Sequence, residues 1–126
     1  MFFRKSMLLA VMTLVSLTYV YAADITGKWN AAFDSQVGPQ KYVFEFKAEG
    51  SKLTGKAIST IADANATTDI TEGKIEGDKV SFVENLNYQG MELKIVYTGT
   101  ITGDEIKLSR TVSDQPGETF VAKRAK

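Results

Sequence analysis

Two side chains of opposite charge end two copies of one sequence repeat. The segment Thr71–Glu84 aligns without gaps on Tyr97–Arg110, so that Glu84 and Arg110 occupy the same position of the repeat. Both copies carry a Gly-Asp pair between alternating apolar residues, a pattern typical of a β-hairpin with a two-residue turn. In this register both charged side chains face the apolar side of their strands. There they could pair with each other, bind a ligand or exchange protons with a substrate.

The amino-acid composition excludes several common kinds of catalytic site. The chain has 126 residues, 15 Lys and Arg, 15 Asp and Glu, and neither His nor Cys. A Ser-His-Asp triad, a cysteine nucleophile, a disulfide and the usual Cys/His zinc sites are therefore excluded. An enzyme would have to use Glu84 as its acid or base, with Tyr97 or Arg110 stabilising charge, and no known motif supports this. We expect a protein that is not an enzyme and that needs no cofactor and no metal.

The N-terminus has the pattern of a secretion signal. Met1–Ser6 contains two basic residues, Met7–Val20 is an apolar run, and small or apolar residues lead up to Ala22. We predict a signal peptide over residues 1–22 and a single domain over residues 23–126, located in the periplasm or secreted. The apolar run is short for a membrane anchor, so we expect no membrane span in the mature chain. Removal of the two basic residues leaves 13 positive and 15 negative side chains, a net charge of −2. A domain with this net charge offers no basic surface for binding nucleic acid.

The remainder of the chain alternates between apolar and polar residues in short segments bounded by Gly, Asn, Asp and Ser. This pattern predicts an all-β domain in which consecutive strands pair in antiparallel fashion, an eight-stranded up-and-down β-barrel. The strands are expected near residues 25–34, 40–48, 53–60, 69–76, 79–87, 91–102, 105–112 and 118–125.

Three two-residue turns, at 50–51, 77–78 and 103–104, predict the register of three hairpins. In this register Ile75 faces Val80 on the apolar side, and the other two hairpins have matching apolar pairs. A glycine also faces a bulky residue in each hairpin, and these pairs are Gly73 with Phe82, Gly99 with Leu108, and Gly55 with Phe46. The three turns fall at one end of the barrel. Longer loops, near 35–39, 61–68, 87–90 and 113–117, are expected at the opposite, open end.

Two short motifs at the ends of the domain resemble those of a known superfamily. Gly27-Lys28-Trp29 looks like the Gly-X-Trp opening of the calycins, which include lipocalins, avidins and fatty-acid-binding proteins, and Phe120–Arg124 looks like their last strand. The resemblance implies a lipocalin-like barrel in which Arg124 packs over Trp29 and closes the base, a structural role for both residues. The biotin-contacting residues of avidins are not recognisable, and the helix that follows a lipocalin barrel is absent, so the resemblance identifies no ligand.

The same alternation predicts which side chains fill the barrel. Besides many apolar and aromatic residues, the inward positions include Glu84 and Arg110, with Tyr97 directly opposite Arg110 and Tyr42 at a similar height. One interpretation is a Glu84–Arg110 ion pair with Tyr97 attached, which seals the upper core. The other is the polar end of a ligand pocket, formed by Arg110, Glu84, Tyr97 and Tyr42, in which Arg110 holds a carboxylate.

Two functions follow from these alternatives. In the first, the barrel binds a small, partly apolar molecule at its open end through Arg110 and Glu84. In the second, the barrel is a filled scaffold whose upper loops bind an envelope protein, as a protease inhibitor does, or a glycan. We expect the first of these, non-catalytic ligand binding.

Overall fold

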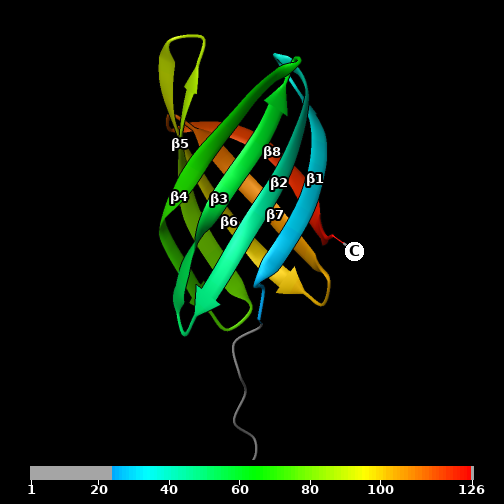
Figure 1. Ribbon diagram of the computed structural model, residues 1–126, viewed down its shortest axis with the longest axis vertical. Coiled ribbons are helices and arrows are strands. Elements are labelled where there is room, and N and C mark those ends of the chain that lie inside the picture. Colours follow the sequence, from blue (N-terminus) through cyan, green and yellow to red (C-terminus); the bar gives the residue numbers. More distant parts are fainter. Residues whose placement is uncertain (1–23, 126) are drawn as a thin grey trace, which may run out of the picture.

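The computed structural model describes residues 24–125, and the predicted signal peptide lies outside them. Eight strands follow one another in a closed antiparallel barrel, in which each strand pairs with its neighbours in the sequence (Figure 1). This confirms the predicted all-β fold. Within this part of the chain, no helix has the length and apolar character needed to cross a membrane. The strands are β1 (Gly27–Ser35), β2 (Gly38–Glu49), β3 (Lys52–Ile61), β4 (Ala64–Glu76), β5 (Lys79–Tyr88), β6 (Met91–Thr102), β7 (Glu105–Val112) and β8 (Gln115–Arg124).

The hairpin turns at the base have the predicted positions and register. The pairs Ala48–Leu53, Ile75–Val80 and Ile101–Ile106 are all formed. These three turns lie together at the lower end of the molecule (Figure 1). The apolar members of each pair face the interior because side chains alternate between the two faces of a strand.

The connections at the other end differ from the prediction. Each of the four expected loops is a two-residue turn, because the flanking strands extend to residues 35 and 38, 61 and 64, 88 and 91, and 112 and 115. Three of the turns have two successive residues at positive φ, Ala62-Asp63, Gln89-Gly90 and Ser113-Asp114. Such a pair forms a type I′ turn, for which the sequence signal is usually glycine or asparagine. That signal is absent from Ala62-Asp63 and Ser113-Asp114, and the glycine of Gln89-Gly90 was included in a longer predicted loop.

One of the three predicted glycine pairs is replaced by a bulge. Gly55 and Gly99 lie opposite Phe46 and Leu108 as predicted. Gly73, predicted opposite Phe82, lies instead in an irregular part of β4, next to a residue with a φ of 53°. A Cβ at Gly73 would come within 2.1 Å of the carbonyl oxygen of Leu53, so the close approach of β3 requires glycine there.

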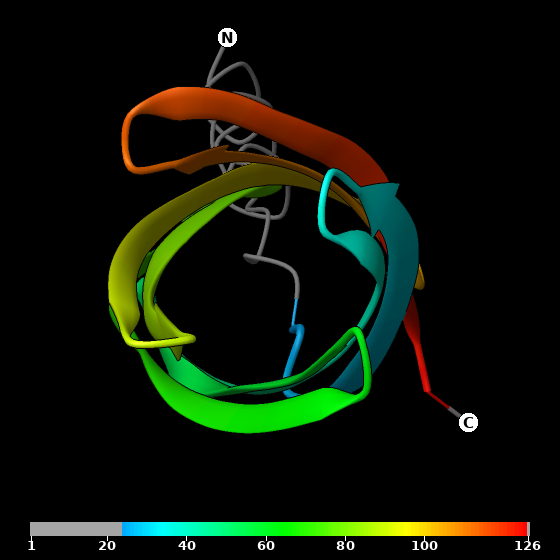
Figure 2. The same cartoon turned by 90° about the horizontal axis from the view of Figure 1, so that it is seen from above.

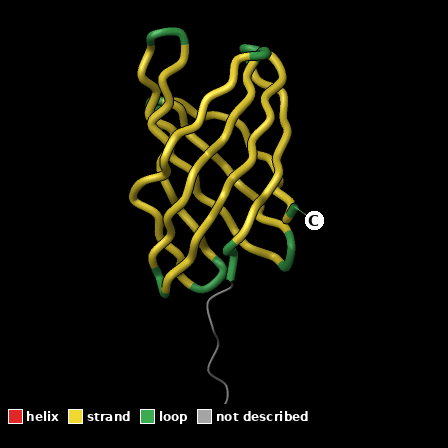
Figure 3. The backbone as a smooth tube through the Cα atoms, viewed as in Figure 1, coloured by secondary structure: helices red, strands yellow, loops and turns green. Residues whose placement is uncertain are grey.

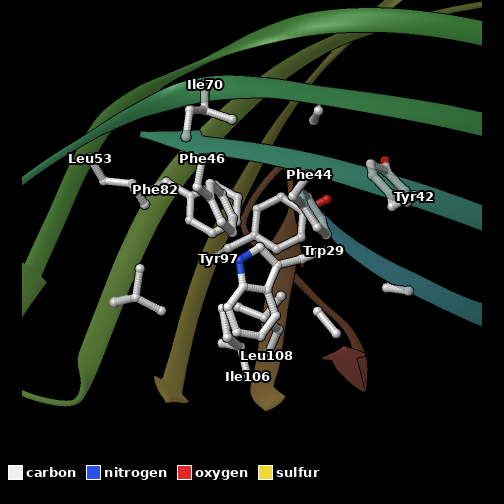
Figure 4. Packing of buried hydrophobic residues seen from close by; sticks show 14 of the residues in the cluster. Trp29, Tyr42, Phe44, Phe46, Leu53, Ile70, Phe82, Tyr97, Ile106 and Leu108 are labelled. Atoms are coloured by element: carbon white, nitrogen blue, oxygen red, sulfur yellow. The ribbon is translucent and has the colours of Figure 1, made fainter. Parts of the chain in front are cut away.

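Aromatic side chains fill the lower and central parts of the barrel. The rings of Phe44, Phe46, Phe82 and Tyr97 contact one another with centroid separations of 4.6 to 5.6 Å (Figure 4). All the predicted interior positions belong to the core or pack against it. The core also includes three isoleucines that were not predicted, Ile25, Ile61 and Ile70. The interior below the level of Tyr42 is therefore occupied by the protein itself.

The barrel closes between β1 and β8, which share fewer register pairs than any other two neighbouring strands. The register pairs between β1 and β8 are Trp29–Arg124 and Asn30–Lys123, at the lower end. Above this point the β7–β8 hairpin diverges and projects beyond the ring when the barrel is viewed from its open end (Figure 2). The β5–β6 hairpin rises above the other connections (Figure 3).

Candidate functional site

The base of the barrel is closed by a cation over an aromatic ring. The guanidinium carbon of Arg124 lies 4.4 Å from the centre of the Trp29 ring, and Trp29 is completely buried. The Trp29 indole N–H donates to the carbonyl oxygen of Ile25 at 2.9 Å. Arg124 donates to the carbonyl oxygens of Thr26 and Asp24, so it ties the entering chain to the last strand. The contact that the calycin resemblance implied is present in the structure.

At the opposite end of the core, a buried carboxylate receives two phenol hydroxyls. Glu84, on β5, has no exposed surface. The hydroxyl of Tyr97, on β6, donates to Oε1 of Glu84 at 2.8 Å, and that of Tyr42, on β2, donates to Oε2 at 3.4 Å. Glu84 and Tyr97 come from the neighbouring strands β5 and β6, and Tyr42 comes from β2 across the barrel, so the cluster spans the interior.

Arg110, on β7, completes this cluster from above. Its Nη1 donates to the hydroxyl oxygens of Tyr97 and Tyr42, at 3.2 and 3.3 Å. Its Nη2 donates to Oε1 of Gln40 at 3.1 Å, and its Nε donates to Oε1 of Glu118 at 2.7 Å. A guanidinium has five N–H donors. One N–H of Nη2 therefore has no partner among residues 24–125.

The predicted direct ion pair between Glu84 and Arg110 is not formed. Arg110 pairs instead with the carboxylate of Glu118, which lies on β8 and is partly exposed. The hydroxyls of Tyr97 and Tyr42 lie between Arg110 and Glu84 and transmit the interaction, because each accepts from the arginine and donates to the carboxylate. The four predicted residues thus form one cluster, with a different pattern of contacts.

Burial determines the protonation of this cluster. It raises the pKa of the Glu84 carboxyl, and the hydrogen bonds donated by Tyr97 and Tyr42 oppose this effect. Burial and the charge of Glu84 raise the pKa of Tyr42 to about 12, and they raise the pKa of Tyr97 well above its ordinary value. Both phenols therefore keep their protons at neutral pH and can donate to Glu84.

A cavity of about 480 Å³ lies above the cluster, at the open end of the barrel; we call it the upper cavity. Of the four predicted residues, only Arg110 lines it. Glu84, Tyr97 and Tyr42 lie behind the arginine and are buried. The lining residues are Ser35, Gln36, Val37, Gln40, Ile61, Leu86, Tyr88, Leu93, Ile95, Arg110, Val112, Gln115, Pro116, Gly117 and Glu118. The cavity thus has apolar walls and a cationic floor.

Sequence reasoning missed two polar residues of this floor. Gln40 has the same inward phase on β2 as Tyr42, and Glu118 has the same phase on β8 as Phe120. Alternation therefore contained the signal for both, but the first was placed at the edge of a loop and the second at the start of its strand. The register of β7 and β8 also shifts between Ser109 and Thr111, and this irregularity lies at Arg110.

The donor set at this site fits anion binding better than metal binding. No group of three metal-ligating side chains occurs among residues 24–125. The guanidinium of Arg110 lies 4.7 Å from the centre of the Phe33 ring, on β1, and donates to side chains on β2, β6 and β8. This geometry fixes a cation at the bottom of an apolar cavity, an arrangement that suits a carboxylate attached to an apolar group.

Comparisons of the chain with protein-family models, with curated proteins and with solved structures found no match in any of the three. The function is therefore inferred from the geometry of the site.

Proposed function

We propose that this protein is a non-catalytic, lipocalin-like barrel that binds a small, partly apolar molecule bearing a carboxylate in the upper cavity. The observation that carries the proposal is the position of Arg110, a guanidinium on the floor of a cavity of about 480 Å³. This volume lies within the range of about 300–1,000 Å³ that is usual for small-molecule sites. Because rings fill the barrel below the arginine, the ligand occupies only the upper part.

Glu118 supports the choice of a carboxylate as the recognised group. Its Oε1 accepts from Nε of Arg110 at 2.7 Å, and the Glu118 side chain borders the cavity. A ligand carboxylate that displaces Glu118 gains Nε and the free N–H of Nη2, the two donors needed for a bidentate contact. Glu118 is then a built-in competitor that holds the cation in place until the ligand arrives.

The apolar part of the ligand contacts the walls of the cavity. Ile61, Leu86, Leu93, Ile95 and Val112 supply aliphatic surface from four strands. Burying apolar surface yields about 25 cal/mol per Å² before the costs of association. A short acyl chain or a single aromatic ring matches this space.

The calycin-like classification and the location of the protein belong to the same proposal. The eight-stranded antiparallel barrel and the contact between Trp29 and Arg124 support the former. The charged and apolar pattern of residues 1–22 supports secretion or export to the periplasm. The alternative of partner binding through upper loops has less support, because every connection at that end is a two-residue turn.

Thermal shifts with a panel of ligands test the proposal. The panel contains acyl and aromatic carboxylates, the corresponding amides, and neutral sugars, each titrated against the wild type, Arg110→Ala and Glu118→Gln. We expect carboxylates to bind and their amides to bind at least about tenfold more weakly, a difference of about 1.4 kcal/mol. Arg110→Ala should abolish the shift, whereas Glu118→Gln should tighten binding severalfold because the competitor loses its charge.

Two results would contradict this function. One is a set of hits whose affinity does not differ between carboxylates and amides. The other is a weaker carboxylate affinity in Glu118→Gln, which would mean that Glu118 assists binding and does not compete with the ligand. The second variant keeps the test informative if Arg110→Ala does not fold.

A further inference from the structure

The junction between β1 and β8 leaves two strand edges without a partner. Pairing ends at Asn30–Lys123, although β1 continues to Ser35 and β8 begins at Gln115. The four pairs joined by turns at the open end are paired up to those turns, whereas the β4–β5 pairing also ends early, at Ile70–Glu84. The junction is therefore open over its upper half.

The hydrogen-bonding direction of β1 follows from one contact at the base. The amide of Ala125 donates to the carbonyl oxygen of Lys28 at 2.8 Å, so Lys28 directs its backbone groups toward β8. This direction alternates along a strand. Asn30, Ala32 and Asp34 therefore face the same way, and the last two have no partner strand.

The same argument applies to β8. The amide of Arg124 donates to the carbonyl oxygen of Asp104 on the β7 side at 2.9 Å, so the odd-numbered neighbours face β1. Val121 and Thr119 thus direct their backbone groups into the opening, and 39% of the surface of Val121 is exposed. Both sides of the junction present the N–H and C=O groups that a strand edge offers to an added strand.

Side chains of the two strands contact each other on the inside of the junction. The rings of Phe33, on β1, and Phe120, on β8, stack with centroids 4.3 Å apart, and Arg110 lies over the Phe33 ring. On the outside a groove of about 600 Å³ follows the junction; we call it the seam groove. It is lined by Asn30, Ala31, Ala32, Lys41, Tyr42, Val43, Val121, Lys123, Arg124 and Ala125.

The lining contains cations and no carboxylate. Arg124 pairs with Asp104, but Lys41 and Lys123 are exposed and form no ion pair within residues 24–125. Val43, Val121 and Ala32 supply apolar surface between the two lysines. The groove therefore combines free strand edges with apolar and positively charged side chains.

We propose that the seam groove accepts an extended segment of another protein as an added strand, one in which acidic and apolar side chains alternate. The backbone of the segment pairs with the free edges at Ala32 and Val121. Its acidic side chains lie beside Lys41 and Lys123, and its apolar side chains face the opposite way, toward the opening between β1 and β8. A second copy of this chain fits less well, because an isologous contact would bring the same lysines together.

The test uses a fluorescein-labelled nonapeptide in which valine and glutamate alternate, with the full protein. Two control peptides carry lysine in place of glutamate, or N-methyl groups on alternate residues that block pairing along one edge. Fluorescence anisotropy should show binding of the first peptide and at least about tenfold weaker binding of both controls. Lys123→Glu should weaken binding severalfold, whereas Lys94→Glu, on β6 and outside the seam groove, should leave it unchanged.

Amide hydrogen exchange locates the contact. In the free protein the amides of Ala32 and Val121 should exchange quickly, and the peptide should protect them. Slow exchange of both amides in the free protein would overturn the proposal, and so would binding that is insensitive to N-methylation or absent for every peptide. Sedimentation that shows a dimer lost with Lys123→Glu would instead assign the groove to a second copy. None of these outcomes depends on ligand binding in the upper cavity.

Discussion

The two ends of the barrel each hold an arginine over an aromatic ring, but the partners of the two cations differ. Arg124, at the base, lies over Trp29 and donates to two backbone carbonyl oxygens. Arg110, at the open end, lies over Phe33 and donates only to side chains. Backbone carbonyls are fixed by the fold, whereas side-chain partners can rearrange. The comparison fits a structural cation at the base and, at the open end, the exchangeable anion site that we propose.

The two arginines also differ in burial, and Arg110 is the more buried of the two. The side chain of Arg110 is 4% exposed, and that of Arg124 is 31% exposed. Removing a charge partner is costly where the remaining charge is buried. We therefore expect the open end to be more sensitive to charge removal, although the base carries the more familiar motif.

The largest expected effect is that of Arg110→Met. This change removes the cation that the two phenols connect to the buried Glu84 and leaves Glu118 without its ion-pair partner, and removing one charge from such a buried network costs about 3–5 kcal/mol. Arg124→Met, the matched change at the base, should cost about 1–2 kcal/mol, because its freed carbonyls can bind water. Urea unfolding at pH 7 measures both. Equal losses would remove the distinction between the two ends.

The next largest effect concerns the two phenols between the charges. Tyr97→Phe should cost about 2–3 kcal/mol, because its hydroxyl makes the shorter hydrogen bond to Glu84, and Tyr42→Phe about 1 kcal/mol. The double variant should show a coupling of at least about 0.5 kcal/mol in a double-mutant cycle. Tyr88→Phe, at the rim of the cavity, serves as the control with no expected loss. Additive losses would mean that the phenols act independently.

A smaller, pH-dependent effect follows from Glu84. Its pKa is raised on folding, so the folded state holds its proton more tightly than the unfolded state does. The resulting stabilisation is complete below the unfolded pKa, near 4.5, and is lost as the pH rises through the folded pKa. The free energy of unfolding of the wild type should therefore fall with pH relative to Glu84→Gln, by at most about 1.4 kcal/mol per pH unit. A difference that is constant from pH 4 to pH 8 would contradict this.

The smallest expected effect comes from neutralising the carboxylate that pairs with each arginine. Glu118 is 26% exposed and Asp104 is 82% exposed at the side chain. Glu118→Gln should reduce the stability by about 1 kcal/mol, and Asp104→Asn by less than about 0.5 kcal/mol. Thermal unfolding at low and high salt measures both, and salt should reduce the smaller effect further. A larger loss from Asp104→Asn would reverse the expected order.

Alternation and turn chemistry made the fold and the lower half of the barrel predictable. The Gly-Asp turns determined the register, and the register placed Glu84, Arg110, Tyr97 and Tyr42 inside. The contacts among these four side chains were not predictable. Alternation shows which side chains point into the barrel, but it does not show how deep in the interior each one lies. It therefore did not show that the phenols lie between the two charges. The tight upper turns were missed because residues such as Ala62 adopt positive φ without a local sequence signal.

The central claim is that Arg110 holds a small carboxylate ligand in the upper cavity. Native mass spectrometry of the protein purified from its own host, compared with the denatured mass of the same sample, tests it most directly. We expect the extra mass of a small carboxylic acid in the wild type and in Arg124→Met, and its loss in Arg110→Met. An extra mass that persists in Arg110→Met, or a bare mass in the wild type, would mean that Arg110 does not hold such a ligand.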